Sequence, residues 1–336
     1  MNVSTNLSFV ISEQTRFVYI VAGVLNMYIL PVIVFTGLLG NAISCCVFSG
    51  RELRRLSSSV YVIAVLGSDS GILIGLLFVW LEVLGYSFNH RQGICQLLVF
   101  LTYVCSFLSV WYIVCITVEN FITICYPAKV KEMCTLQRAR AVVIILLLVA
   151  MCLYSLSLIS TEVKENAESK RSMCDRKPEY YVMFSVLTYV DSVITLVIPL
   201  TVIALMLTTM SVAIANTFRW KKLSPSREMS RKSFVFNCPQ VRVTKMLFAL
   251  STSFLIMNAP VHIARLHYLV RAFSRSPGVS YNEGLLQLIL LFISYANCSI
   301  KFFLFLSFSK NFRKSIKKKY YSKLPQCSRP SEPTFV

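Results

Sequence analysis

The stretch "ICQLLVFLTYVCSFLSVWYIVCITVENFITICYP", residues 94 to 127, decides the fold. Its first part, residues 94 to 118, has no charged side chain and exceeds the roughly 20 apolar residues that a helix needs to cross a bilayer core. One carboxylate, Glu119, interrupts the run, and Pro127 closes it. The segment therefore predicts a membrane-spanning helix rather than a core helix of a soluble domain.

Six further apolar runs accompany this one. The seven predicted spans are Phe17–Phe48, Ser57–Tyr86, Ile94–Tyr126, Ala141–Ile159, Tyr181–Ala215, Val241–Val270 and Leu285–Phe308. The chain of 336 residues is 56% hydrophobic and 15% charged, whereas soluble domains carry about 25% charged residues. The runs do not alternate in polarity, which argues against a β-barrel. We therefore expect an all-α membrane protein, a seven-transmembrane helix bundle without a second soluble domain.

Basic residues are concentrated on one side of this bundle. If the N-terminus lies outside, the inner segments hold 23 of the 34 Lys and Arg residues and four of the 15 Asp and Glu residues. Those inner segments are Gly50–Arg55, Ala128–Arg140, Asn216–Lys245 and the tail from Ser309. This asymmetry follows the positive-inside rule. Topology and attraction to anionic inner-leaflet lipid explain the net charge of +19, so we expect a lipid bilayer and no nucleic acid as partner.

The orientation divides the chain into three parts. Residues 1–16 are predicted to be an extracellular N-terminus, 17–308 the transmembrane domain, and 309–336 a cytoplasmic helix 8 and tail. Glycosylation sequons at Asn2 and Asn6 lie on the predicted outer side. No separate signal peptide precedes the first span, which we expect to act as an uncleaved anchor. These features predict a multi-pass protein of the plasma membrane.

Several landmarks follow one another in a characteristic order. They are Gly40-Asn41, Asp69, Cys95 with Asn120 25 residues later, Cys174, Pro199 in "LVIPL", Pro260 in "FLIMNAP", and "SKNFRKSIKKKY" after the last span. In this order and spacing the chain resembles a rhodopsin-like (class A) G-protein-coupled receptor over essentially its whole length. The resemblance implies a Cys95–Cys174 disulfide, a short amphipathic eighth helix, an extracellular peptide or small ligand, and a heterotrimeric G protein as partner.

The residues that this family uses as activation switches are altered. Its acid–arginine–tyrosine triplet reads Glu119-Asn120-Phe121, and the motif of the last helix reads Lys301 to Phe305. Asn258, two residues before Pro260, replaces a tryptophan. The pattern is similar to that of divergent invertebrate peptide receptors. Without an arginine partner, Glu119 is expected to be solvated or partly protonated, and a chemosensory or weakly signalling receptor remains an alternative.

Four polar residues of the predicted bundle form a second set. Asp69 and Ser109 match the sodium-site positions of the family, and Lys301 replaces an asparagine that faces this site; Asn41 lies on the first helix. We expect the Lys301 ammonium to occupy the sodium position and to pair with Asp69, because a buried charge without a partner is costly. Alternatively, Lys301 extends to the cytoplasmic interface.

The ligand pocket is predicted from position. Asp191 lies two helical turns before Pro199, and on the sixth span three residues with i, i+4, i+7 spacing share one face. The candidates are Thr102, Tyr103, Ser106, Asp191, Asn258, His262, Arg265 and Tyr295. Arg265 is expected to receive a ligand carboxylate or, alternatively, to pair with Asp191. Thr102 stands where amine receptors carry an aspartate, which argues against an amine ligand.

Other functional classes find little support. The three histidines show no metal-ligand spacing, and no constellation of residues predicts an enzyme or a metal site. A transporter would show inverted repeats, which are absent from the sequence. No cofactor is expected, because Tyr295 stands where opsin-like receptors carry their retinal-binding lysine. The C-terminal Thr334-Phe335-Val336 resembles an end that binds a PDZ domain.

Overall fold

The computed structural model describes residues 16–51, 53–86, 91–165, 172–223, 239–273 and 281–317. Within them lie seven helices long and apolar enough to cross a membrane. The sequons at Asn2 and Asn6 and the last three residues fall outside the described part of the chain.

The first span, Arg16–Phe48, contains the π-helical turn η1 (Leu25–Ile29) and α2 (Leu30–Phe48). The next elements are α3 (Ser57–Val83), α4 (Ile94–Cys125), the loop helices η3 (Pro127–Lys129) and α5 (Val130–Met133), α6 (Leu136–Tyr154) and α7 (Leu156–Ser160). They are followed by β1 (Thr161–Glu165), β2 (Ser172–Arg176), η4 (Pro178–Tyr180), α8 (Tyr181–Ser192), η5 (Val193–Val197), α9 (Ile198–Leu223), α11 (Pro239–Phe273), α12 (Tyr281–Phe308) and α13 (Lys310–Ile316).

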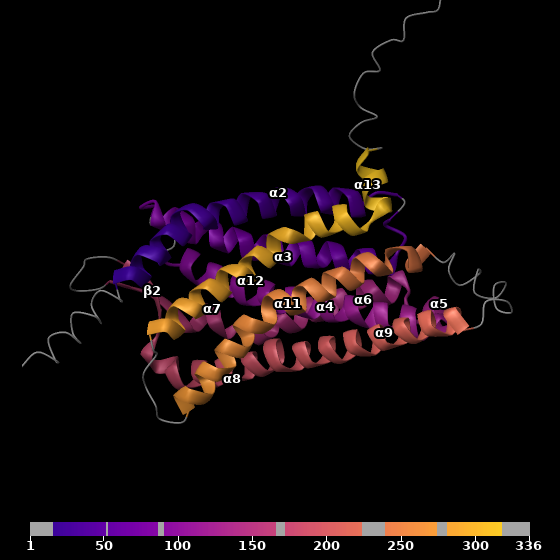
Figure 1. Cartoon of the computed structure of the whole chain (residues 1–336). Helices are drawn as coiled ribbons and strands as arrows, with labels where there is room; N and C mark the ends of the chain where they lie inside the picture. The colour runs from indigo at the N-terminus through magenta and orange to yellow at the C-terminus, as the bar shows by residue number, and fades with distance from the viewer. Residues whose placement is uncertain are drawn as a thin grey trace, which may run out of the picture.

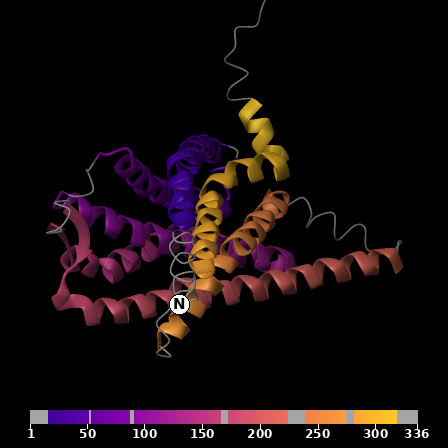
Figure 2. The same cartoon turned by 60° about the vertical axis from the view of Figure 1, so that its left-hand side comes forward.

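The long helices run side by side, so that the bundle has two distinct ends (Figure 1). The antiparallel hairpin of β1 and β2 lies at one end, which we call the disulfide end because it also holds Cys95 and Cys174. The labelled helices α5 and α13 lie at the opposite end (Figure 1). Because α4 begins beside Cys95 and ends at Cys125, Asn120 also lies toward this end, which is called here the Asn120 end. Figure 2 shows that α9 extends past its neighbours at the Asn120 end.

Hydroxyl side chains within these apolar helices bond back to their own backbone. Ser44 Oγ donates to Gly40 O at 2.7 Å, and Thr201 Oγ1 donates to Val197 O at 2.8 Å. Lipid offers no hydrogen-bond partners, so every polar group in the bilayer core must be satisfied within the protein. Local bonds of this kind satisfy these hydroxyls, whereas a few buried polar atoms of the described residues, such as Trp111 Nε1 and Asn120 Nδ2, have no hydrogen-bond partner.

Small residues let α2 approach α12. A Cβ atom added at Gly37 would lie 2.5 Å from Ser299 Oγ, and one added at Gly40 would lie 2.9 Å from Phe302 Cβ. Ser299 Oγ also donates to Ile33 O at 2.7 Å. Close approach through small residues is the usual way in which membrane helices gain packing energy. It fixes the first and last spans against each other.

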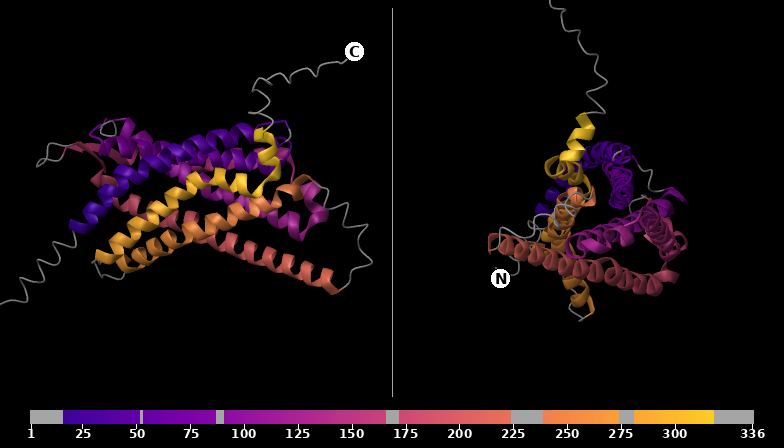
Figure 3. Two further views of the ribbon diagram at one scale, coloured as in Figure 1. Left: turned by 45° about the horizontal axis from the view of Figure 1, so that its top comes forward. Right: turned by 90° about the vertical axis from the view of Figure 1, so that its right-hand side faces the viewer.

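Aromatic rings anchor α13 to the bundle at the Asn120 end. Phe312 is fully buried, with ring centroids 5.6 Å from Phe48 and 5.5 Å from Phe305. Ser309 Oγ caps the helix by accepting from Phe312 N at 3.2 Å. Lys310, Arg313 and Lys314 remain exposed, and α13 turns away from α12 (Figure 3). This amphipathic helix and the seven spans confirm the predicted fold class.

Several helices are longer than the apolar runs that predicted them. The fourth begins at Leu136 instead of Ala141, because Thr135 Oγ1 accepts from Arg138 N at 3.4 Å and caps it. Likewise, α9 continues to Leu223, beyond the predicted end at Ala215. Apolar runs mark the part of a helix in hydrocarbon, whereas capping and charged turns extend it beyond that part.

Candidate functional site

A cavity of about 990 Å³ opens among the helices at the disulfide end. All eight residues proposed from the sequence as ligand contacts line it: Thr102, Tyr103, Ser106, Asp191, Asn258, His262, Arg265 and Tyr295. They come from α4, α8, α11 and α12, and α3 contributes Glu82. Ligand cavities commonly measure about 300–1,000 Å³, so this one can hold a sizeable molecule.

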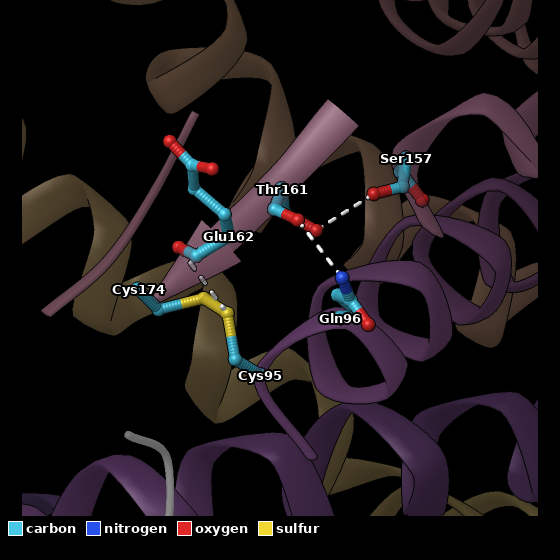
Figure 4. Close-up of a disulfide and its surroundings, with 6 residues drawn as sticks. All are labelled: Cys95, Gln96, Ser157, Thr161, Glu162 and Cys174. Atoms are coloured by element: carbon cyan, nitrogen blue, oxygen red, sulfur yellow. Dashed lines mark hydrogen bonds between the residues drawn. A yellow bond between two sulfur atoms is a disulfide. The ribbon is translucent and has the colours of Figure 1, made fainter. Parts of the chain in front are cut away.

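The cavity is bordered by a covalently held hairpin. Cys95, at the start of α4, forms a disulfide with Cys174 of β2, as predicted. Thr161 O of β1 accepts from Gln96 Nε2 at 3.0 Å, and Thr161 Oγ1 donates to Ser157 O at 2.8 Å (Figure 4). Cys174 and Asp175 line the cavity. The disulfide and these two hydrogen bonds therefore hold the strands over the cavity edge.

Asp191 has a partner that the sequence did not suggest. The Tyr154 hydroxyl of α6 donates to Asp191 Oδ1, and the buried Tyr154 ring stacks on Tyr103 with centroids 5.4 Å apart. Among the described residues, no carboxylate oxygen lies within 4.0 Å of the Arg265 guanidinium. The proposed Asp191–Arg265 salt bridge is therefore not formed in this structure, and Arg265 faces the cavity with its charge unpaired by this chain's described acids.

Asn258 connects two helices across the cavity wall. Its Nδ2 donates to Phe254 O at 3.0 Å, and its Oδ1 accepts from Ser294 Oγ of α12 at 2.6 Å. Pro260 lies inside α11, two residues further on. The contact joins the proline-containing helix to α12 beside the cavity.

Below the cavity lies a fully buried ion pair. Lys301 Nζ of α12 is 2.5 Å from Asp69 Oδ2 of α3, and both side chains are at most 1% exposed. Ser109 Oγ of α4 donates to Asp69 Oδ1 at 2.6 Å, and Lys301 Nζ donates to Asn297 O at 3.1 Å. Ser109 and Asn297 also line the cavity. Lys301 thus points inward to Asp69 and does not extend to the interface.

Asn41 bonds not to this ion pair but to the residue that follows Asp69. Its Nδ2 donates to Ser70 Oγ of α3 in a long, 3.5 Å hydrogen bond. Asn41 is fully buried. The structure therefore groups Asp69, Ser109 and Lys301 directly, while Asn41 supports α3 from the side of α2.

Asn120 occupies the position at which the family resemblance predicts an arginine, so the neighbouring Glu119 has only a neutral hydrogen-bond donor. Glu119 is only 8% exposed and accepts from Ser58 Oγ of α3 at 2.6 Å. Of the two expectations for Glu119, the solvated one is therefore wrong, because the start of α3 covers the side chain, whereas the partly protonated one stays a prediction. Asn120 is buried, and its Nδ2 has no hydrogen-bond partner among the described residues. Burial, and secondarily the Glu119 charge, raises the pKa of the nearby Cys134 thiol to about 11.

A further bond at this end joins α4 to α11. Thr117 Oγ1 donates to Ser251 Oγ at 2.8 Å, and both residues are fully buried. Phe121 packs beside Tyr126, with ring centroids 5.7 Å apart. Phe305 belongs to the aromatic cluster that anchors α13. The sequence analysis did not identify Ser58 and Ser251 as residues that bond to α4. The three consecutive serines at residues 57–59, at the start of an apolar span, could have indicated polar contacts there.

Residues 40–301 match the family described as 7 transmembrane receptor (rhodopsin family). The chain is 23% identical to the "Neuromedin U receptor homolog nmur-2" of Caenorhabditis elegans over 310 residues, 82% of this chain and 74% of that protein. It is 23% identical to the mouse "Growth hormone secretagogue receptor type 1" (83% and 76% covered), and 21% identical to the zebrafish "G-protein coupled receptor 183-A" (87% and 78% covered). The chain belongs to the rhodopsin family of seven-transmembrane receptors.

Proposed function

We propose that this chain is a plasma-membrane receptor that binds an extracellular peptide and signals through a heterotrimeric G protein. The observation that carries the proposal is the 990 Å³ cavity at the disulfide end, lined by both apolar and polar side chains from several helices. The basic inner segments favour an orientation in which this end faces outward. Residues 1–16 then form an extracellular N-terminus, and 309–336 a cytoplasmic helix and tail.

A peptide fits the cavity better than a lipid. The lining includes the charged residues Glu82, Asp175, Asp191 and Arg265. Among the described residues no carboxylate lies within 4.0 Å of Arg265, so its guanidinium needs a polar partner when a ligand excludes water. One relative is named as a homolog of the neuromedin U receptor and another as a growth hormone secretagogue receptor. Arg265 is the proposed contact for a ligand carboxylate, because a guanidinium binds carboxylates in a bidentate manner and Asp191 is already bonded to Tyr154.

Signalling would proceed by a shift between two packings of the bundle. The ligand contacts α11 through His262 and Arg265, and Asn258 links α11 to Ser294 of α12. Movement of α11 would break the Thr117–Ser251 bond at the other end. The Asp69–Lys301 pair holds α3 and α12 together beneath the cavity, where its ammonium takes the place of a bound sodium ion.

A second candidate function is a receptor with weak or no coupling. The specific observation that favours it is Asn120, a buried neutral amide whose Nδ2 is unbonded among the described residues. An amide lacks the fixed charge and the five donors of arginine. Such a receptor would bind its ligand with little nucleotide exchange.

Ligand-stimulated nucleotide exchange distinguishes the two candidates. Membranes containing the receptor and purified G proteins are screened with a peptide library, and both peptide binding and nucleotide exchange are measured. The proposal predicts that a peptide that binds also accelerates exchange, and that Arg265→Gln weakens binding at least tenfold if a carboxylate is recognised, since a charged hydrogen bond contributes about 1.5–3 kcal/mol. Binding without exchange on any G protein would favour the weakly coupled receptor.

A further inference from the structure

Asp191 is an ionisable residue within a membrane-spanning segment. It belongs to α8, inside the span Val186–Thr217, and its side chain lines the ligand cavity. An ionisable group inside a membrane span is costly unless it has a partner or reaches water, so it commonly marks a functional site. The carboxylate of Asp191 therefore needs partners either within the bundle or from the cavity.

One oxygen of this carboxylate is held by the protein. Tyr154 Oη of α6 donates to Asp191 Oδ1. The Tyr154 ring is only 1% exposed and is fixed by two rings of α4. It stacks on Tyr103 at an interplanar angle of 15°, and it meets Phe107 in a T-shaped contact with centroids 6.0 Å apart. Because the ring is held in this way, its hydroxyl fixes the orientation of the carboxylate, and Tyr154 is a positioning residue for Asp191.

The other oxygen of the carboxylate has no partner in the part of the chain that the structure describes. Asp191 Oδ2 accepts no hydrogen bond there, and no Lys, Arg or His nitrogen of the described residues lies within 4.0 Å of it. Arg265, which lines the same cavity, is farther away than this. The Tyr154 hydroxyl is a neutral donor, so it does not cancel the carboxylate charge. That charge is left to a partner from the cavity.

The charged groups that line the cavity have a negative excess. The described lining holds the carboxylates of Glu82, Asp175 and Asp191, against the guanidinium of Arg265. A ligand whose only charge is a carboxylate would satisfy Arg265 but would leave Asp191 uncompensated when it excludes water. A ligand that carries a cation as well as a carboxylate complements both signs of charge in the cavity.

We propose that Asp191 binds a cationic group of the ligand through Oδ2, and that the ligand is a peptide with a basic side chain as well as a free carboxylate. The ammonium or guanidinium of the ligand donates to Oδ2, while Tyr154 stays on Oδ1 and Arg265 binds the ligand carboxylate. Hydrogen bonds between two charged groups are shorter and stronger than neutral ones. The peptide nature of the ligand rests on the proposed function, whereas the cation site rests on the geometry around Asp191.

Affinity selection followed by mass spectrometry tests the proposal on the full-length receptor in phosphatidylcholine nanodiscs, without a G protein. The probes are two libraries of short N-acetylated peptides with free carboxylates. One library contains lysine and arginine, and the other has the neutral analogues norleucine and citrulline in their place. The parent should retain basic peptides about tenfold or more over neutral ones, the usual contribution of a hydrogen bond to a charged group. In Asp191→Asn this ratio should fall to about one.

Three further variants separate recognition of a cation from a structural role of Asp191. Asp191→Glu keeps the charge and should keep a preference for basic peptides. Glu179→Gln removes an exposed carboxylate that follows β2 but does not line the cavity, so it should retain the ratio of the parent. Tyr154→Phe keeps the Asp191 charge but releases its orientation, so its ratio should lie between those of the parent and Asp191→Asn. An unchanged ratio in Asp191→Asn overturns the proposal, as does an equal loss in Glu179→Gln, and an unchanged ratio in Tyr154→Phe overturns the positioning role.

Thermal unfolding with small probes tests the cation site without any peptide. Phenethylamine, a small cation, should raise the midpoint of the parent more than its neutral analogue 2-phenylethanol, and this difference should vanish in Asp191→Asn. Equal responses of the parent to the two probes would overturn the cation site. A response to phenethylamine without retention of basic peptides would show a site for a small amine and overturn the peptide class. Neither assay includes a G protein, so their failure is distinguishable from a failure of the proposed signalling.

Discussion

The buried Asp69–Lys301 pair allows a double-mutant cycle with a clear expected sign. The perturbations are Asp69→Asn, Lys301→Met and the double variant, which keep side-chain volume while removing one or both charges. In the parent, Lys301 Nζ is 2.5 Å from Asp69 Oδ2 and neither side chain is more than 1% exposed. Removing one partner of such a pair costs about 3–5 kcal/mol, because it leaves an uncompensated buried charge, whereas replacing both is often nearly neutral.

The assay is thermal unfolding of the receptor in phosphatidylcholine nanodiscs. At about 2 °C per kcal/mol for a chain of this size, each single variant should lower the midpoint by roughly 6–10 °C. The double variant should recover most of this loss. The reasoning is refuted if the two single effects simply add in the double variant, since additivity means that the two charges do not interact.

A sodium titration extends the same experiment. In Lys301→Asn the ammonium is removed, while Asp69 and Ser109 remain bonded to each other, so sodium should raise the midpoint of this variant relative to potassium at equal ionic strength. The parent, with its internal ammonium, should respond equally to the two salts. A variant that does not distinguish the salts would count against the ammonium as a substitute for sodium.

Three further variants test the contacts between helices. Thr117→Val removes the 2.8 Å bond to Ser251. At about 1 kcal/mol for a hydrogen bond, this loss should raise basal nucleotide exchange about fivefold. The control is Thr123→Val, whose hydroxyl bonds only to its own helix at Glu119 O, and it should leave basal exchange unchanged. Tyr154→Phe removes the hydroxyl that bonds to Asp191 and should lower the thermal midpoint by roughly 4 °C, for a loss of about 2 kcal/mol; an unchanged midpoint would show that this bond contributes nothing. Asn120→Arg should increase ligand-driven exchange by offering Glu119 a cationic partner, whereas no change would mean that the usual role of the arginine has moved to other residues.

The seven-helix bundle was predictable because few backbone structures satisfy all their hydrogen bonds within hydrocarbon. An apolar run such as residues 94–118 must form a helix in a bilayer, and the basic segments indicate which ends lie together. Helix ends were less predictable. The early start of α6 depends on the Thr135 cap, a local polar contact to which a hydropathy pattern is insensitive.

The residues that line the ligand cavity were predictable from the sequence, but the hydrogen bonds among them were not. Offsets from Pro199 and Pro260 identified Asp191 and the face of α11. Between Asp191 and Pro199, however, the π-helical turn η5 adds a residue to one turn, which changes the direction of Asp191 relative to the proline. The Tyr154 contact depends on that geometry and on a helix 37 residues earlier, so counting positions along one helix could not find it.

We propose that the cavity at the disulfide end binds a peptide and that this binding drives G-protein coupling. The most direct test is peptide-stimulated nucleotide exchange in membranes, comparing the parent with Arg265→Gln. A peptide with a free carboxylate should stimulate exchange in the parent, and Arg265→Gln should need at least tenfold more peptide for half-maximal exchange. Equal sensitivity of the two proteins to that peptide would contradict the role of Arg265, and saturable peptide binding without exchange would contradict coupling itself.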